Sequence, residues 1–213
     1  GLSVDYGIGF EQQVDFFCKK LSAELIELED IYKLIPNHFP SLHFAFETAF
    51  LDLQNGGKRI IFENEFSQNE KGIPINGLVW MGDEAFMQKQ IQAKLKQGFT
   101  CIKMKIGAID FETEFKLLTS IRQKYSKEQI TLRVDANGAF SFEEAKEKLA
   151  RLAKLGIHSI EQPIRTKQLK SMRKLCQQNA LDIALDEELI GIWELEKKRN
   201  LLKQIQPQYI ILK

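Results

Sequence analysis

The sequence has 213 residues, of which 44% are hydrophobic and 28% are charged, and its formal net charge is +1. This length allows one large domain or two small ones, with enough apolar side chains for a substantial core. Nothing in this charge balance suggests attraction to nucleic acids or membranes, which would need a concentrated basic surface, and no apolar stretch is long enough to span a membrane. We therefore expect neither nucleic acid nor membrane among the partners.

The cysteines and the start of the chain indicate the compartment. Cys18, Cys101 and Cys176 are scattered and include no C-x-x-C pair, so the sequence predicts neither a zinc site nor a disulfide framework. Nothing at the start has the pattern of a secretory signal. We expect reduced, mostly buried thiols in a cytoplasmic protein.

The first part of the chain contains two helical patterns. Residues 10–31 carry an amphipathic pattern that predicts one helix, and Pro36 and Pro40 follow it. Residues 41–54 predict a second, strongly apolar helix, which ends at Asn55 and the two glycines after it.

From residue 73 onward, strand patterns and helix patterns alternate. The predicted strands are residues 75–80, 100–106, 130–135, 157–161, 182–186 and 209–213. The predicted helices between them are residues 83–98, 110–124, 141–156, 166–178 and 192–203. This alternation predicts an α/β fold with parallel strands and helical crossovers, either a doubly wound open sheet or a (β/α)8 barrel.

A charged residue closes each of the last five predicted strands. Lys105, Asp135, Glu161, Asp186 and Lys213 follow one another at intervals of 30, 26, 25 and 27 residues, which fit one strand, one helix and two loops. A barrel collects functional groups from the carboxyl ends of nearly all its strands, whereas an open sheet binds mainly at one switch point. The pattern therefore favours a (β/α)8-type barrel, incomplete in this sequence because about six of eight strands are visible.

The strand over residues 100–106 carries two lysines on one face. Lys103 and Lys105 are two residues apart, so they point the same way, while Ile102, Met104 and Ile106 point towards the helices. Burial and mutual repulsion are expected to lower the pKa of these lysines, as a general base near neutral pH requires. The alternative is a pair of lysines on a solvated edge strand.

Three acids close the next three strands. Asp135, Glu161 and Asp186 would repel one another, and a hard divalent cation such as Mg²⁺ resolves that conflict. The alternative for each acid is a helix cap or a salt bridge. Asn137, two residues beyond Asp135, is expected to bind substrate or to order a metal ligand. Arg133 shares the face of Asp135, where it either joins the site or forms a structural ion pair.

Lys213 is predicted to face the same centre from the last strand. A metal with amines on opposite sides suits removal of the proton α to a carboxylate, because the charge that develops is held as an enediolate. A small-molecule carboxylate is therefore the expected substrate. His38, His43 and His158 do not close strands and are interpreted as packing or surface residues.

Five motifs together resemble the enolase superfamily, in its muconate-lactonising-type subgroup. They are Lys103-Met-Lys105, Arg133-Val-Asp135-Ala-Asn137-Gly138, Ile160-Glu161-Gln162-Pro163, Ala184-Leu185-Asp186-Glu187 and Ile211-Leu212-Lys213. The resemblance implies that residues 39–213 form the barrel domain and that residues 1–38 are the tail of an N-terminal α+β capping domain. It also implies the lysine base and Mg²⁺-stabilised enediolate that are established for this superfamily.

Within that subgroup, the segments around Glu161 and Asp186 are most similar to the bacterial o-succinylbenzoate synthases. The resemblance implies a lyase of menaquinone biosynthesis that dehydrates 2-succinyl-6-hydroxy-2,4-cyclohexadiene-1-carboxylate. Asp135, Glu161 and Asp186 would hold Mg²⁺, or Mn²⁺ in its place. Lys105 and Lys213 would be catalytic, and Lys103, Arg133 and Asn137 would bind substrate.

Two alternatives stay open at this point. Racemases or epimerases of N-acylamino acids or dipeptides, and cycloisomerases, use the same lysine pair and metal. A non-catalytic barrel that keeps the acids as a structural metal or salt-bridge site belongs to a different class of protein.

Overall fold

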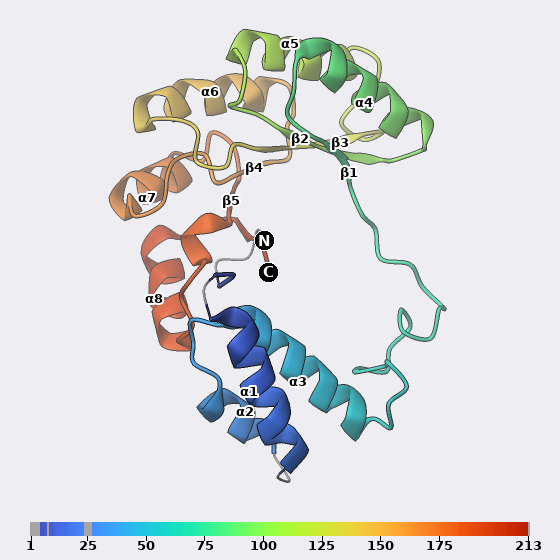
Figure 1. The fold of residues 1–213 in the computed structure, drawn as a ribbon. Helices are drawn as coiled ribbons and strands as arrows, with labels where there is room; N and C mark the ends of the chain where they lie inside the picture. Colours follow the sequence, from blue (N-terminus) through green and yellow to red (C-terminus); the bar gives the residue numbers. More distant parts are fainter. Residues whose placement is uncertain (1–4, 8, 24–26, 213) are drawn as a thin grey trace. The chain divides into compact units, whose positions relative to one another are not determined.

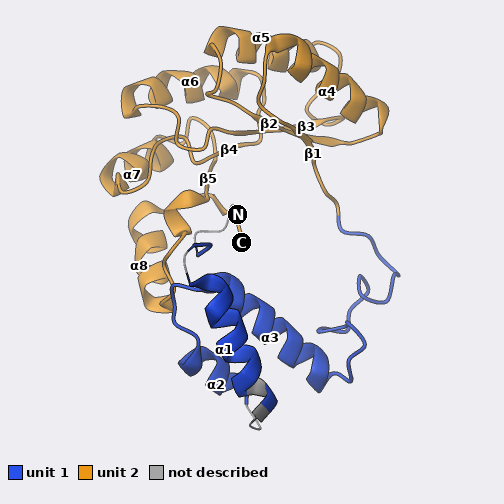
Figure 2. Ribbon diagram, in the orientation of Figure 1, with its two compact units in different colours: residues 1–73 blue, residues 74–213 orange. Residues whose placement is uncertain are grey.

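The chain forms two compact units, residues 1–73 and residues 74–213 (Figure 2). The structure is a computed structural model that describes residues 5–7, 9–23 and 27–212. Among these residues, no helix is long and apolar enough to cross a membrane.

The first unit contains three helices, α1 (Phe10–Ala23), α2 (Leu28–Leu34) and α3 (Pro40–Gln54). A small core joins them, formed by the buried side chains of Phe17, Ile31, Ile35 and Leu42. The predicted apolar helix over residues 41–54 is confirmed as α3, with Pro40 in its first turn, where a missing N–H costs no hydrogen bond.

The single helix predicted over residues 10–31 is wrong, because a new helix begins after Glu27. Glu27 has an extended backbone, with φ −92° and ψ 164°, and its N–H donates to the Asp30 carboxylate at 3.1 Å. Such a reciprocal cap starts a helix of its own. The amphipathic pattern thus runs through two short helices, and residues 24–26 lie outside the described residues.

The second unit alternates strands and helices as predicted. Its strands are β1 (Gly77–Val79), β2 (Cys101–Lys105), β3 (Thr131–Asp135), β4 (Ser159–Glu161), β5 (Ile183–Leu185) and β6 (Tyr209–Ile210). Its helices are α4 (Glu84–Lys96), α5 (Phe111–Arg122), α6 (Phe142–Lys154), α7 (Leu169–Gln178), the 3₁₀ turn η1 (Glu187–Leu189) and α8 (Leu195–Ile205). Residues 141–144 form the capping box that Ser141 and Glu144 predict, and it begins α6.

The order of the strands decides between the two predicted architectures. All six strands are parallel, and each pairs only with its neighbours in the sequence, in the order β1-β2-β3-β4-β5-β6. Because crossovers between parallel strands are right-handed, such an order places every helix on the same face, and Figure 1 shows α4 to α7 along the outside of a curved sheet. A doubly wound sheet would carry helices on both faces, so the barrel-type prediction is confirmed.

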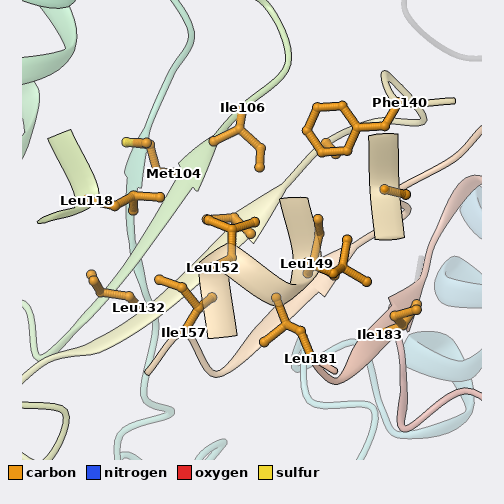
Figure 3. Close-up of a cluster of buried hydrophobic side chains, with 14 of the residues drawn as sticks. Met104, Ile106, Leu118, Leu132, Phe140, Leu149, Leu152, Ile157, Leu181 and Ile183 are labelled. Carbon is orange, nitrogen blue, oxygen red and sulfur yellow. The ribbon is translucent and has the colours of Figure 1, made fainter. Parts of the chain in front are cut away.

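The core of this unit lies between the sheet and its helices. Ile102 and Met104 of β2, and Leu132 and Val134 of β3, are almost fully buried against the helices. Figure 3 shows part of this cluster, including Leu149, Leu152 and Leu118 from the helices. Because side chains alternate along a strand, burial of these residues turns the residues between them to the inner face of the sheet.

Candidate active site

The three predicted acids lie together at the carboxyl ends of neighbouring strands. Asp135 ends β3 and is directly opposite Glu161, which ends β4, while Asp186 follows β5. The exposed fractions of the three residues are only 2%, 5% and 2%. The Asp186 carboxyl also acts on Glu161, since it is one cause of the raised pKa of Glu161.

Both lysines of β2 reach these acids, as the shared-face prediction requires. The Lys103 ammonium forms ion pairs with Glu161 and with the Asp135 carboxylate, the latter at 3.3 Å. The Lys105 ammonium lies 3.0 Å from Asp135 Oδ2 and donates to Asn137 Oδ1 at 2.6 Å. The alternative of a solvated lysine pair is thus excluded, since both ammonium groups are mostly buried among carboxylates.

The acid cluster carries more negative charge than its surroundings favour. The pKa of Glu161 is raised to about 7, chiefly by burial and also by the charge of Asp135 and the nearby Asp186 carboxyl, while the bond from Lys103 opposes the rise. For Lys103, burial lowers the pKa, but bonds to Glu161 and Asp135 outweigh burial, so that the net pKa is raised. The predicted downward shift is therefore wrong for Lys103, because its attraction to Glu161 and Asp135 exceeds the effect of burial.

The Asn137 amide bonds Lys105 at the same strand ends, whereas Arg133 forms no ion pair with the acids among the described residues. Asn137 accepts from Lys105 and donates through Nδ2 to Glu187 at 2.8 Å, and so links the ends of β2, β3 and β5. Arg133 is exposed, and among the described residues no ion pair joins it to an acid.

Arg133 instead lines a cavity of about 280 Å³ on the inner face. Its lining includes Lys103 and Glu161, together with His158 and Tyr209 near the amino ends of β4 and β6 and Ile211 just past the end of β6. The His158 ring lies 5.1 Å from the Tyr209 ring, which fits the packing role predicted for this histidine.

The sequence reasoning missed an aromatic side chain beside Lys105. The Lys105 ammonium lies 5.0 Å from the centre of the Trp80 ring, a distance at which a cation is attracted to an aromatic face. Gln90 of α4 holds the Trp80 backbone by bonds to its N–H and its carbonyl, at 3.0 and 2.9 Å. The position of Trp80 at the end of the first predicted strand was the signal available.

The donor types at the strand ends fit a hard divalent cation. Three buried carboxylates at adjacent strand ends supply the oxygen donors that such a cation prefers. Within the described part of the chain, no three His, Cys, Asp or Glu side chains are already gathered around one point. Lys103 bonds both Asp135 and Glu161 in this arrangement. Lys213, the other predicted catalytic lysine, lies outside the described residues.

Comparison with known proteins gives the family. The model of the family described as "Enolase C-terminal domain-like" matches residues 86–205, which is more than half of the chain. The chain belongs to this enolase C-terminal domain-like family.

Individual members of the enolase family are also similar. An o-succinylbenzoate synthase of Desulfotalea psychrophila is 54% identical over 82% of this chain and 47% of its own length. The crystal structure of MenC from the same species has a TM-score of 0.85 and 43% identity, covering 100% of this chain and 66% of that one. A synthase from Thermosynechococcus elongatus, described as complexed with Mg in the active site, has a TM-score of 0.70 and 25% identity, covering 92% and 57%.

The chain therefore spans about half of the curated relative and up to two thirds of the solved chains that it matches. These likenesses confirm the enolase-type barrel that the motifs predicted.

Proposed function

We propose that the protein is a Mg²⁺-dependent o-succinylbenzoate synthase. The observation that carries the proposal is a lysine ammonium, that of Lys105, held 3.0 Å from one of three buried carboxylates at adjacent strand ends. The 54% identity to an o-succinylbenzoate synthase selects this reaction from those that such a site supports.

The reaction breaks a C–H bond α to the ring carboxylate and a C–O bond on the adjacent carbon. Lys105, as the neutral amine, takes the α-proton, and the same proton leaves with the hydroxyl group as water, so that the ring becomes aromatic. Asn137 and Asp135 hold the Lys105 amine on the side of the acids, and the Trp80 ring covers it. A positioned base of this kind contributes about 10²–10⁴-fold to a rate.

Asp135, Glu161 and Asp186 would hold Mg²⁺, or Mn²⁺ in its place. When bound, the metal would supply a positive charge that stabilises the enediolate and so lowers the barrier to removal of the α-proton. Lys103, Asn137 and Arg133 would bind the substrate; the contacts of Lys103 with Glu161 and of Asn137 with Lys105, and the place of Arg133 in the lining of the inner cavity, support this proposal. We assign Lys213 to the opposite side of the substrate, as the sequence motif predicts.

The remaining predictions from the sequence belong to this proposal. Residues 1–38 would be the tail of the capping domain and residues 39–213 the barrel domain, although helix α3 packs within the unit of residues 1–73. A cytoplasmic location and a small carboxylate as partner fit the reaction, and the three cysteines are free thiols.

The test is incubation of the purified chain with 2-succinyl-6-hydroxy-2,4-cyclohexadiene-1-carboxylate and Mg²⁺. We expect an aromatic ultraviolet product that fails to form after chelation of the metal or in Asp186→Asn. Calorimetry should show weaker Mg²⁺ binding by Asp186→Asn than by the parent chain. Absence of product from a chain that binds Mg²⁺ would refute the synthase assignment.

The alternative chemistry has its own readout. An epimerase would exchange the α-proton of a dipeptide or an N-acylamino acid with solvent deuterium, and the substrate would racemise. A non-catalytic barrel would give neither product nor exchange.

A further inference from the structure

A buried glutamine lies at the centre of the acid cluster, and none of the roles above uses it. Gln162 follows Glu161 directly and has an exposed fraction of 0%. Its φ of +38° is in the left-handed region, which side chains other than glycine adopt at a cost. A strained backbone beside a functional site persists only where the surroundings hold it, so its contacts indicate what it does.

The Gln162 side chain connects β4 to the segment after β5. Its Oε1 accepts from the backbone N–H groups of Asp186 and Glu188, at 3.2 and 3.3 Å. Its Nε2 donates to the Ile164 carbonyl at 3.0 Å and lies 3.4 Å from Glu188 Oε2. Both polar ends of the amide are therefore satisfied, as burial requires.

The Gln162 backbone connects the strands on both sides. Its N–H donates to the Ala184 carbonyl of β5 at 2.9 Å, and its carbonyl accepts from the N–H of Gly138, just after β3, at 2.7 Å. One residue is thus bonded to the ends of β3 and β5 while its own chain ends β4. These are the three strand ends that carry Asp135, Glu161 and Asp186.

We propose that Gln162 is a positioning residue that sets the spacing of the three carboxylates and so prepares them to bind a divalent cation. The part that concerns the cation rests on the proposed function. Asp186 is the acid most dependent on this contact, because it lies beyond the last paired residue of β5 and its own N–H is bonded by Gln162. Partners that orient metal ligands in this way commonly change metal affinity by about 10–100-fold when they are removed.

The test removes the side-chain bonds and keeps the volume. Gln162→Met has a similar length and the same unbranched stem, so the backbone strain is retained while the amide is lost. Gln168→Met is the matched control, because Gln168 is exposed and its amide bonds only the nearby Arg165 carbonyl. Mg²⁺ binding is measured by calorimetry without substrate, and amide hydrogen exchange is measured by mass spectrometry.

A second variant distinguishes positioning from folding. The double change Gln162→Glu with Glu188→Gln exchanges the two groups. A side-chain oxygen at position 162 then again accepts from the Asp186 N–H and an amide at position 188 faces it, while the Ile164 carbonyl loses its donor. We expect Gln162→Met to weaken Mg²⁺ binding by about 10–100-fold, and we expect the double variant to recover part of that loss. Exchange should become faster at Asp186 and Glu188 in Gln162→Met, and stay unchanged in the core strands.

Two results would overturn the inference. One is Mg²⁺ affinity in a folded Gln162→Met that equals the affinity of the Gln168→Met control. The other is unchanged exchange at Asp186 and Glu188. A parent chain that binds no Mg²⁺ would refute the metal assignment instead, and hydrogen exchange alone would then decide whether Gln162 positions Asp186.

Discussion

Removal of the Glu114 carboxylate should destabilise the loop that follows the lysine strand. Glu114 of α5 has an exposed fraction of 1%, and its oxygens accept from the backbone N–H groups of Gly107, Ala108 and Ile109. The two bonds to Gly107 are 2.8 and 2.9 Å, and the others are 3.3 and 3.4 Å. This loop begins two residues after Lys105, so one buried acid anchors the segment that leaves the site.

The magnitude follows from the number of donors left without an acceptor. Because Gly107 and Ala108 are exposed, water can reach their N–H groups, and each lost bond costs about 0.5–1.5 kcal/mol; Glu114→Ala, which removes the acceptor of three N–H groups, should therefore lower the free energy of unfolding by roughly 1.5–4.5 kcal/mol. Glu114→Gln keeps an oxygen in the place of Oε1, which accepts three of the four bonds. Its loss should be about 1 kcal/mol, the usual value for one hydrogen bond.

The pH dependence provides a second check. Burial raises the pKa of Glu114, while bonds from Gly107, Ile109 and Ala108 and the charge of Lys148 oppose the rise without cancelling it. Between the ordinary carboxyl pKa and the raised one, the folded chain keeps a proton that the unfolded chain has released. The contribution of Glu114 to stability therefore falls as pH rises through this window, and Glu114→Gln should lack that fall.

Urea denaturation followed by circular dichroism, repeated across this pH range, measures both effects. A Glu114→Ala variant as stable as the parent would refute the anchoring role. A parent that becomes more stable relative to Glu114→Gln as pH rises would show that the direction of the pKa shift is wrong.

Three other substitutions or treatments test the site and the core. Lys105→Ala should lower turnover by about 10²–10⁴-fold while Mg²⁺ binding is nearly retained. Lys116→Ala, at an exposed position, should leave turnover unchanged. Equal turnover rates for the two variants would refute the role of Lys105 as general base. Leu118→Ala, at a fully buried position, should lower the free energy of unfolding by about 2–5 kcal/mol in urea, and a loss below the error of the fit would contradict the core described above. Burial raises the pKa of the Cys176 thiol to about 11. A thiol reagent at mildly alkaline pH should therefore label the exposed Cys18 at once and Cys176 only when the chain unfolds. Prompt labelling of Cys176 would contradict its burial.

Local pattern was sufficient to predict most elements of the second unit and the acids at its strand ends. Each of the six predicted strands is present, because an apolar run bounded by helical patterns and turn residues is a local signal. Apolar periodicity gave a wrong result for residues 10–31, because it continues past the point where one helix ends and α2 begins. That boundary depends on how Glu27 and Asp30 cap α2. Periodicity describes which face is apolar and does not show where the backbone leaves the helix.

Contacts between distant residues were beyond the reach of local pattern. The Lys103–Glu161 ion pair joins residues 58 positions apart, and together with Asp135 it outweighs the lowering of the Lys103 pKa by burial. The bonds of Gln162 to Asp186 and of Trp80 to Gln90 likewise depend on strand order and on helix placement. No spacing along the chain encodes these partners.

The sequence by itself determined the alternation of strands and helices, the position of each charged residue at a strand end, and the face on which Lys103 and Lys105 lie. These follow from side-chain periodicity, which every segment carries independently of its neighbours. Only the tertiary structure decided the order of the strands, and with it the choice of barrel over open sheet. It also decided which charges meet and which way a pKa moves, because burial and Coulomb attraction depend on distances that exist only once the strands have paired.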